Sequence, residues 1–321
     1  MTKRTGILGL IAFIAVFFYS CESEDNTTEG SWEAVESPTS SWLMDVHFTD
    51  DVNGWAVGWN GTLLQTDNGE NWQSFSITGI TDDRLYGVAF SDNQHGVIVG
   101  YSTTNQAIAY ATRNGGTSWT EVTLPFKNFT PRAVAFAENG KGWITGSEGT
   151  ILYTEDKGQS WQLRDSETAT SLYGIATVEE NKVFVCGSST LLYSADAGSS
   201  WQQLIDEQDG YGWLQDVYFT DDNSGWIATG GGTGSIYYTP DGGQTWEKQL
   251  ETDTEYLKSV FFSSPEKGWT VGEAGNIYRT KDGEQWFKIE NPVNYDLSDV
   301  HFTNASNGWA VGYNGTLLLF N

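Results

Sequence analysis

Cysteine, histidine and basic residues are scarce in this chain of 321 residues, and no long apolar run occurs beyond its N-terminus. The two cysteines cannot provide a disulfide framework, and Cys186 lies in an apolar run typical of a buried, inert thiol. Sixteen Lys and Arg stand against 42 Asp and Glu, which gives a formal charge of −26. Because clustered Lys and Arg are needed to bind a phosphate backbone, this composition excludes a nucleic-acid partner.

The N-terminus differs in composition from the rest of the chain. Lys3 and Arg4 precede an apolar run over residues 7–18, which is shorter than the roughly 20 residues that a membrane-spanning helix needs. This pattern predicts a signal peptide over residues 1–20. The tetrapeptide Phe18-Tyr19-Ser20-Cys21 resembles the lipobox of bacterial lipoproteins, which implies acylation of Cys21 and a membrane contact through that lipid anchor. An ordinary secretory signal beside a chance cysteine is the alternative.

Residues 21–30 are polar and acidic, and we expect them to form a flexible tether. The acidic residues directly after Cys21 are similar to the export signal of surface lipoproteins in some Gram-negative bacteria. This similarity implies an outer-membrane lipoprotein of the cell envelope, exposed at the surface, whereas a solvated linker is the alternative. Without the signal peptide the chain has 42 acidic against 14 basic residues, which suits a protein outside the cytoplasm.

From Trp32 onward, short apolar runs alternate with turns rich in Gly, Asn and Asp, and helical periodicity is lacking. A tryptophan follows a polar turn six times, at spacings of 47, 42, 40, 45 and 40 residues. A period of roughly 40 to 50 residues with four short strands is typical of a β-propeller. We therefore predict an all-β fold of seven four-stranded antiparallel blades, in one monomeric domain over residues 31–321.

The repeat also predicts how the ring closes. Seven inner strands are expected, at residues 43–48, 85–90, 132–136, 172–177, 214–219, 257–262 and 297–302. The last unit lacks a fourth strand, but Ser31–Val35 matches Asn71–Phe75, and Trp32 precedes Trp72 by one period of 40 residues. The N-terminal strand, residues 31–36, should therefore complete the last blade and leave no open sheet edge.

The turns before the tryptophans follow the pattern Ser/Thr-x-Asp-x-Gly-x-x-Trp. A short carboxylate or amide can accept hydrogen bonds from its own turn, glycine adopts the positive φ, and the indole covers the hairpin. The expected structural residues are Asn114, Asp156, Asp196, Asp241, Trp119, Trp161, Trp201 and Trp246. Two turns, before Trp72 and Trp286, are one residue shorter and should be tighter. The pattern resembles the Asp-box, or bacterial neuraminidase repeat, which implies a structural role on the face away from a ligand site.

A second motif, Gly-Trp-Ala-Val-Gly, occurs at Gly54–Gly58 and at Gly308–Gly312, with a close variant at Gly268–Gly272. Together with the turns, it makes the repeating unit similar to the photosystem II assembly and stability factor family over Trp32–Asn321. This resemblance implies a seven-bladed propeller that engages a protein partner. We expect no cofactor.

Comparison of the seven units separates the residues that the fold fixes from those that it leaves free. Twelve of the fifteen tryptophans recur at fixed positions and are predicted to be core. The other three stand just before an inner strand or just after a second strand, and both positions should lie on the face opposite the box turns. The residues expected to bind a ligand or partner there are Trp42, Trp59, Tyr101, Trp213, Tyr256, Tyr313, Arg84 and Arg132.

Aromatic rings with acidic neighbours suit a protein hot spot or a sugar surface equally well, and simple packing at the channel mouth is a third interpretation. The arginine cluster of a sialidase is absent, and no pair of carboxylates is singled out by spacing for glycoside hydrolysis. His47 and His301 hold equivalent positions but lack a third ligand, so no metal site is predicted. We expect a non-catalytic, lipid-anchored module that holds a protein partner; the alternative is a propeller that binds or hydrolyses a glycan.

Overall fold

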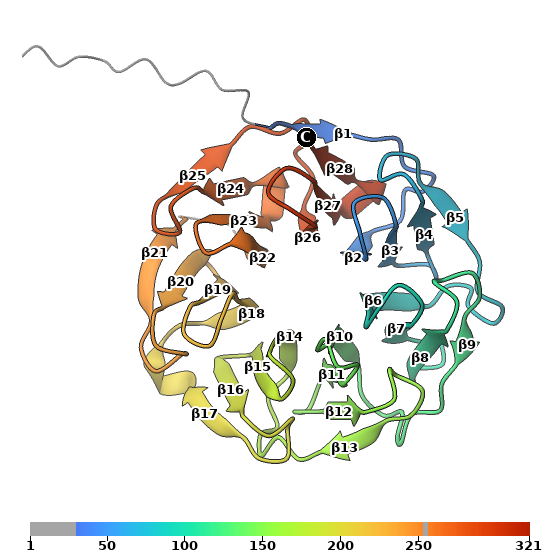
Figure 1. The fold of residues 1–321 in the computed structure, drawn as a ribbon, viewed down its shortest axis with the longest axis horizontal. Helices are drawn as coiled ribbons and strands as arrows, with labels where there is room; N and C mark the ends of the chain where they lie inside the picture. The colour runs from blue at the N-terminus through green and yellow to red at the C-terminus, as the bar shows by residue number, and fades with distance from the viewer. Residues whose placement is uncertain (1–29, 253–255) are drawn as a thin grey trace, which may run out of the picture. The chain divides into compact units, whose positions relative to one another are not determined.

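The computed structural model describes residues 30–252 and 256–321, in which seven four-stranded antiparallel sheets form a closed ring (Figure 1). Each sheet is one blade, with its first strand at the central channel and its last strand at the outer edge. The predicted seven-bladed all-β propeller is therefore confirmed.

The blades follow one another along the chain. Blade 1 consists of β2 (Leu43–Phe48), β3 (Gly54–Gly58), β4 (Leu63–Thr66) and β5 (Gln73–Phe75). Blade 2 consists of β6 (Arg84–Phe90), β7 (Gly96–Tyr101), β8 (Ala107–Thr112) and β9 (Thr120–Glu121). Blade 3 consists of β10 (Pro131–Phe136), β11 (Gly142–Gly146), β12 (Ile151–Thr154) and β13 (Gln162–Arg164). Blades 4 and 5 consist of β14 (Leu172–Val178), β15 (Lys182–Gly187), β16 (Thr190–Ser194) and β17 (Gln202–Ile205); and β18 (Trp213–Phe219), β19 (Gly225–Gly230), β20 (Ser235–Thr239) and β21 (Glu247–Glu251).

Blades 6 and 7 consist of β22 (Leu257–Ser264), β23 (Lys267–Gly272), β24 (Ile277–Thr280) and β25 (Trp286–Ile289); and β26 (Leu297–Phe302), β27 (Gly308–Gly312), β28 (Leu317–Phe320) and β1 (Trp32–Ala34). In the part of the chain that the structure describes, three short 3-10 helices lie in the loops: η1 (Glu207–Asp209), η2 (Glu273–Gly275) and η3 (Tyr313–Gly315). Within residues 30–252 and 256–321, no helix is long and apolar enough to cross a membrane.

The N-terminal strand closes the ring. β1 pairs antiparallel with β28, with Trp32 opposite Phe320 and Ala34 opposite Leu318. The Ser31 N–H donates to the Asn321 carbonyl at 2.8 Å, which extends the pairing by one residue. The predicted closure is thus confirmed, with strand pairing over Trp32–Ala34, inside the expected range 31–36.

Stacked rings join neighbouring blades. At five of the seven seams, the phenylalanine that ends an inner strand stacks on the ring at the second position of the preceding blade's second strand. Phe48 stacks on Trp309 in this way, with centroids 3.5 Å apart. Phe302 stacks on Trp269 in the same way at 3.8 Å. A Cβ at Gly54 would lie only 2.4 Å from the Phe48 ring. The glycine of the Gly-Trp motif is therefore required because the phenylalanine of its own blade occupies that space.

Eight of the twelve tryptophans predicted to be core are buried. They are Trp32, Trp55, Trp72, Trp143, Trp161, Trp226, Trp269 and Trp309. The other four, Trp119, Trp201, Trp246 and Trp286, are only half-buried and pack at the edges of the apolar clusters. A neighbouring blade covers only part of each of these four indoles.

The box turns have the expected internal hydrogen bonds. The Asp156 carboxylate accepts N–H donors from Gln159 and Ser160, at 3.0 and 2.9 Å, while the Thr154 hydroxyl accepts the Gly158 N–H. In a shorter turn the cap is Asn68, which accepts from Glu70 and Asn71, one residue closer along the chain. Because the Asn68 cap accepts from N–H groups one residue nearer, this loop is tighter, as expected.

The same face carries cationic bridges between blades 2, 3, 4 and 5. Lys157 lies 2.7 Å from the Asp92 carboxylate of the preceding blade. Lys141 donates to Asn181 at 2.6 Å, and Lys182 pairs with Asp222 of blade 5. These three seams are thus joined at the box face by lysine side chains.

Candidate partner-binding face

The residues predicted to bind a partner lie at the face opposite the box turns, and all of them except Arg132 belong to pairs that we call rim pairs. Each rim pair joins two residues of one blade. The first residue directly precedes the leucine or proline near the start of the inner strand. The second is the last residue of the second strand or the residue just after it. The Trp59 N–H, for example, donates to the Trp42 carbonyl at 2.9 Å. In blade order the rim pairs are Trp42/Trp59, Arg84/Tyr101, Thr130/Ser147, Ser171/Ser188, Trp213/Gly230, Tyr256/Glu273 and Asp296/Tyr313.

Aromatic rings of blades 7 and 1 and an arginine of blade 2 form a continuous surface, which we call the Trp42 cluster. The ring centroids of Tyr295 and Tyr313 are 6.1 Å apart, and those of Tyr313 and Trp42 are 5.5 Å apart. Trp42 and Trp59 follow at 5.2 Å, and the Arg84 guanidinium lies 4.6 Å from the Trp59 ring centroid. Half of Tyr313 is exposed, so the cluster presents ring surface to solvent.

A buried-side contact fixes the position of Trp42. Its indole N–H donates to the Ser298 hydroxyl at 2.7 Å, and the Lys258 ammonium lies 5.3 Å from the ring centroid. Lys258 also pairs with Asp296 at 3.0 Å. Partial burial opposes ionisation of Asp296, but the N–H of Ala274 and the Lys258 ammonium lower its pKa below the usual value. The cation is therefore held between an indole and a carboxylate.

The other predicted residues lie apart from this cluster. Trp213 stands on blade 5, with 51% of its surface exposed, and its nearest aromatic neighbour is Tyr256 at 6.3 Å. Tyr101 is half-buried opposite Arg84. Arg132 lies one position inside the channel mouth, where its guanidinium is 5.2 Å from the Tyr86 ring. The face therefore holds two separate aromatic surfaces and a polar channel mouth.

The channel mouth is a polar cavity of about 200 Å³. Its walls include Arg132, Tyr86, Tyr173 and Lys258, and its floor contains the three carboxylates of Asp45, Asp216 and Asp299. An irregularity in each inner strand, such as the one between Leu43 and Asp45, turns two successive side chains towards the channel.

The floor carboxylates join blades. Asp45 accepts the Val88 N–H of blade 2 at 2.7 Å, and Asp216 accepts the Val260 N–H of blade 6 at 3.0 Å. Asp299 accepts both the Val46 N–H of blade 1 and the Ser259 hydroxyl of blade 6. Four consecutive seams, from blade 5 through 6, 7 and 1 to blade 2, are thereby bridged inside the channel.

Burial raises the pKa of these carboxyl groups. For Asp216 burial outweighs the hydrogen bonds from N–H groups and raises the pKa to about 7. Burial and the neighbouring Asp299 carboxylate raise the pKa of Asp45 well above the usual range. The floor therefore holds protons near neutral pH, which is a consequence of its structural position rather than evidence of catalysis.

His47 and His301 meet below this floor, in a second cavity of about 220 Å³. Their ring centroids are 5.0 Å apart. Burial lowers the pKa of His47 to about 4, and burial together with His47 lowers that of His301 well below its usual value. Over the described ranges no group of three or more His, Cys, Asp or Glu side chains could hold a metal ion.

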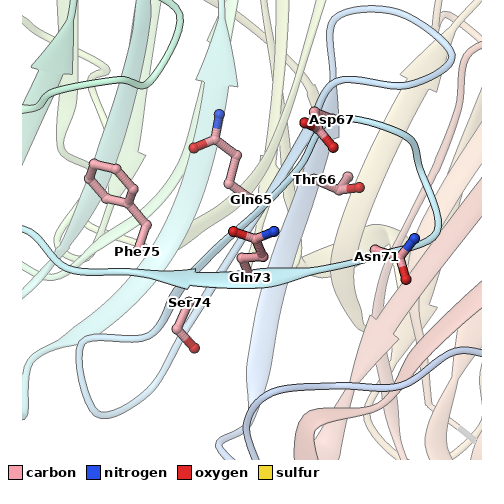
Figure 2. Close-up of a pocket in the computed structure, with 7 residues that line it drawn as sticks. All are labelled: Gln65, Thr66, Asp67, Asn71, Gln73, Ser74 and Phe75. Atoms are coloured by element: carbon pink, nitrogen blue, oxygen red, sulfur yellow. The ribbon is translucent and has the colours of Figure 1, made fainter.

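A further pocket lies on the outer side of blade 1 (Figure 2). It follows the β4–β5 hairpin, between Gln65, Gln73 and Phe75, and reaches the turn residues Asp67 and Asn71. All its lining residues belong to one hairpin and its box turn. We attribute this pocket to the shape of the blade.

Sequence analysis missed Lys258, Asp296 and Ser298, which position Trp42, because their contacts cross from one blade to another. It also missed the floor carboxylates. Asp45, Asp216 and Asp299 occupy the same place in three inner strands, so aligning the seven strands would have revealed them. Cys21, the predicted lipidation site, lies outside the described residues.

Known proteins resemble this chain along most of its length. The family model described as "Photosynthesis system II assembly factor YCF48" matches residues 24–124, 70–167, 113–208 and 203–281. The photosystem II assembly protein Ycf48 of Thermosynechococcus vestitus is 26% identical, over 77% of this chain and 84% of the relative. The photosystem II assembly lipoprotein Ycf48 of Trichormus variabilis is 24% identical, over 81% of this chain and 89% of the relative.

Solved structures agree with these relatives. A structure titled "YCF48 bound to D1 peptide" has a TM-score of 0.74 and 26% identity, and covers 90% of this chain and 94% of its own. A virginiamycin B lyase from Staphylococcus aureus has a TM-score of 0.76, 12% identity and coverage of 91% and 99%, which shows a shared fold alone. The relatives are assembly factors, in agreement with a chain that is not an enzyme. From its repeats, its seven-bladed fold and the match over most of its length, this chain belongs to the Ycf48 family of assembly factors.

Proposed function

We propose that this protein is a lipid-anchored assembly module of the cell envelope that holds a protein partner on the face of the rim pairs. The observation that carries the proposal is the Trp42 cluster, a solvent-facing run of aromatic rings that ends at Arg84. The repeat does not require these residues, and aromatic and arginine side chains dominate protein hot spots. The relative bound to a D1 peptide supports a protein segment as the ligand.

The guanidinium of Arg84 gives this face a preference for carboxylate groups. Arg84 and Arg132 are exposed and stack on aromatic rings. A stacked guanidinium keeps its N–H edge free for a bidentate contact with a carboxylate. The partner should therefore present an acidic side chain or a chain terminus to this part of the face, with apolar side chains over the neighbouring rings.

Site-specific photo-crosslinking in intact cells tests the partner surface. A benzoylphenylalanine residue replaces Trp59 or Tyr313 on the proposed face, or replaces Leu163 or Phe287, which are exposed apolar residues of outer strands. We expect a discrete protein adduct from the first two positions and none from the control positions. The same adduct from all four, or adducts from the controls alone, would contradict the proposal.

The glycan alternative has its own test. Protein starting at residue 22 is applied to a glycan array, alone and as the variants Trp59→Ala and Trp213→Ala. Silence of the array agrees with a protein partner. If the protein binds one class of sugar and both substitutions abolish this binding, the face recognises carbohydrate rather than a protein partner.

The anchor is proposed on the lipobox-like tetrapeptide and on relatives that are named lipoproteins. Substitution of Cys21 by serine should move the protein from the membrane fraction to the soluble fraction of the envelope. If Cys21→Ser leaves the protein in the membrane fraction, lipidation is not the anchor. An outer-membrane location with surface exposure predicts labelling of intact cells by a membrane-impermeant reagent, and labelling only after lysis would exclude it.

A further inference from the structure

The indole of Trp213 is uncovered because both of its neighbours in the rim are small. In blade 1, Trp42 has Tyr313 of the preceding blade on one side and Trp59 of its own blade on the other. The matching neighbours of Trp213 are Ser188, which forms a bridge to it from blade 4, and Gly230. Neither can cover an indole, and 51% of Trp213 is exposed.

The surrounding loops leave this ring open as well. A Cβ at Gly230 would lie 2.0 Å from the Tyr256 ring, so this position has to be glycine for Tyr256 to pack where it does. The following Gly231 and Gly232 have φ values of 108° and 129°, which disfavour any larger side chain. A Cβ at Gly232 would have no neighbour within 4 Å. The chain thus keeps side chains away from one face of Trp213.

Elsewhere on this face, tryptophan rings have a cation over them. The Arg84 guanidinium covers Trp59 at 4.6 Å from the ring centroid. Lys258 lies 5.3 Å from the centroid of Trp42, and Asp296 holds the ammonium from the other side. In the described part of the chain, no Lys or Arg lies over Trp213. The two covered rings show which chemical group fits this kind of site.

The electrostatic surroundings of Trp213 favour the same group. The described loops of blades 4 to 6 on this face contain carboxylates and no Lys or Arg; the carboxylates are Asp165, Glu167, Asp206, Glu207, Asp209 and Glu273. Burial and then the Asp209 carboxylate raise the pKa of Tyr211, two residues before Trp213. Burial and then Glu273 raise the pKa of Tyr256. Carboxylates thus lie in the loop that leads to Trp213 and beside Tyr256.

Resting on the proposed function, we infer that the surface made by Trp213 and Tyr256 receives a Lys or Arg side chain of the protein partner. The cation lies on the indole face and is attracted by the carboxylates of the η1 loop, as Lys258 lies between Trp42 and Asp296. This surface is separate from the Trp42 cluster and takes the opposite charge. The partner segment thus has a cationic residue over blade 5 and an acidic group near Arg84.

A peptide titration tests this inference. The probe is a fluorescein-labelled peptide of three Gly-Arg repeats, with Gly-Gln and Gly-Glu peptides of equal length as controls, and binding is measured by anisotropy on protein starting at residue 22. Trp213→Ala should weaken binding of the arginine peptide about two- to fivefold, as expected for an exposed cation–π contact. Trp213→Phe should recover part of this loss. Because Trp213 is exposed, neither variant should unfold the propeller.

A matched pair of charge variants separates a local site from general attraction to an acidic protein. One variant carries Asp206→Asn, Glu207→Gln and Asp209→Asn beside Trp213. The other carries Glu138→Gln, Glu179→Gln and Glu180→Gln on the box face. We expect the first triple to weaken binding several-fold more than the second. Equal weakening by both triples, or no effect of Trp213→Ala, would overturn the inference.

The outcome also distinguishes this inference from the proposed function. If crosslinks form at positions 59 and 313 but Trp213→Ala does not change binding of the arginine peptide, the proposed partner face is supported and the cationic contact at Trp213 is wrong. If the peptide binds at Trp213 but no crosslink forms on the face, the assembly function is wrong. A Gly-Glu peptide that binds better than the Gly-Arg peptide would contradict the sign of the charge.

Discussion

Removal of the Trp32 side chain should weaken the closure of the ring more than any other single truncation in β1. Trp32 is 4% exposed, and its ring lies 5.3 Å from Phe320 and 5.7 Å from Phe302, measured between centroids. Large-to-small substitution of a buried Trp costs about 3 to 5 kcal/mol. With a shift of roughly 2 to 4 °C per kcal/mol in a domain of this size class, Trp32→Ala should lower the Tm by on the order of 10 °C.

Thermal unfolding followed by circular dichroism at one fixed scan rate measures this effect. The matched control is Trp213→Ala, the same chemical change at an exposed position, which should shift the Tm by at most about 2 °C because surface substitutions usually change stability by within about 0.5 kcal/mol. Deletion of residues 31–36 should exceed the effect of Trp32→Ala, and deletion of residues 22–29 should have almost none. Equal melting temperatures for the two deletions, or for the two alanine variants, would refute closure through β1.

Three further predictions concern single positions. Asp156→Ala should lower the free energy of unfolding by about 1 to 2 kcal/mol because two turn N–H groups lose their acceptor. Asp156→Asn should be nearly neutral, since Asn114 already accepts the Ser118 N–H in another blade at 3.0 Å. An equal loss of stability in both variants would contradict the capping role. The pKa of Asp216 is raised to about 7 from a usual value near 4, so the native state binds its proton more tightly and loses stability as the pH rises from about 4 to 7. The Tm of Asp216→Asn should therefore rise relative to that of the wild type from pH 5 to pH 8. The control Asp221→Asn, in an exposed turn, should show no such trend. If the Tm values of Asp216→Asn and wild type change in parallel with pH, the raised pKa of Asp216 is wrong. Lys258→Met should shift the 19F NMR signal of Trp42 in protein labelled with 5-fluorotryptophan, because the cation over that ring is lost. The signal is assigned by its disappearance in Trp42→Phe, and an unchanged shift would mean that Lys258 does not cover Trp42 in solution.

Most of the scaffold followed from the sequence because each unit repeats a local pattern that determines its own strands. The inner strand β2 has the predicted bounds, and β22 differs only by two added residues at its end. The match between Ser31–Val35 and Asn71–Phe75 was sufficient to predict a pairing between residues at opposite ends of the chain. Repetition thus replaced the long-range information that a single sequence usually lacks.

The arrangement on the partner face was less predictable for two physical reasons. Contacts such as that of Lys258 with Trp42 cross two blades and depend on the twist and packing of the sheets. The irregularity at the start of each inner strand also breaks the alternation of side chains, so that Met44 and Asp45 both line the channel mouth. Strict alternation of side chains along the strand would have placed one of these two residues in the core. Sequence placed Trp213 on the correct face but could not show that its neighbours leave it open.

The seams of this ring are of two chemical kinds. Carboxylates inside the channel join blades 5, 6, 7, 1 and 2, and their hydrogen bonds respond to protonation. At the equivalent places blades 2, 3 and 4 have Gly87, Ala133 and Gly174, and at their seams up to blade 5 lysine contacts at the box face are added to the apolar packing.

Exposed ion pairs weaken with ionic strength, whereas buried hydrogen bonds are screened much less. Salt should therefore weaken the pairs Lys157–Asp92 and Lys182–Asp222, and a rise in pH should weaken the carboxylate bridges of the other arc. The two arcs of the ring should therefore respond to different changes of the solvent.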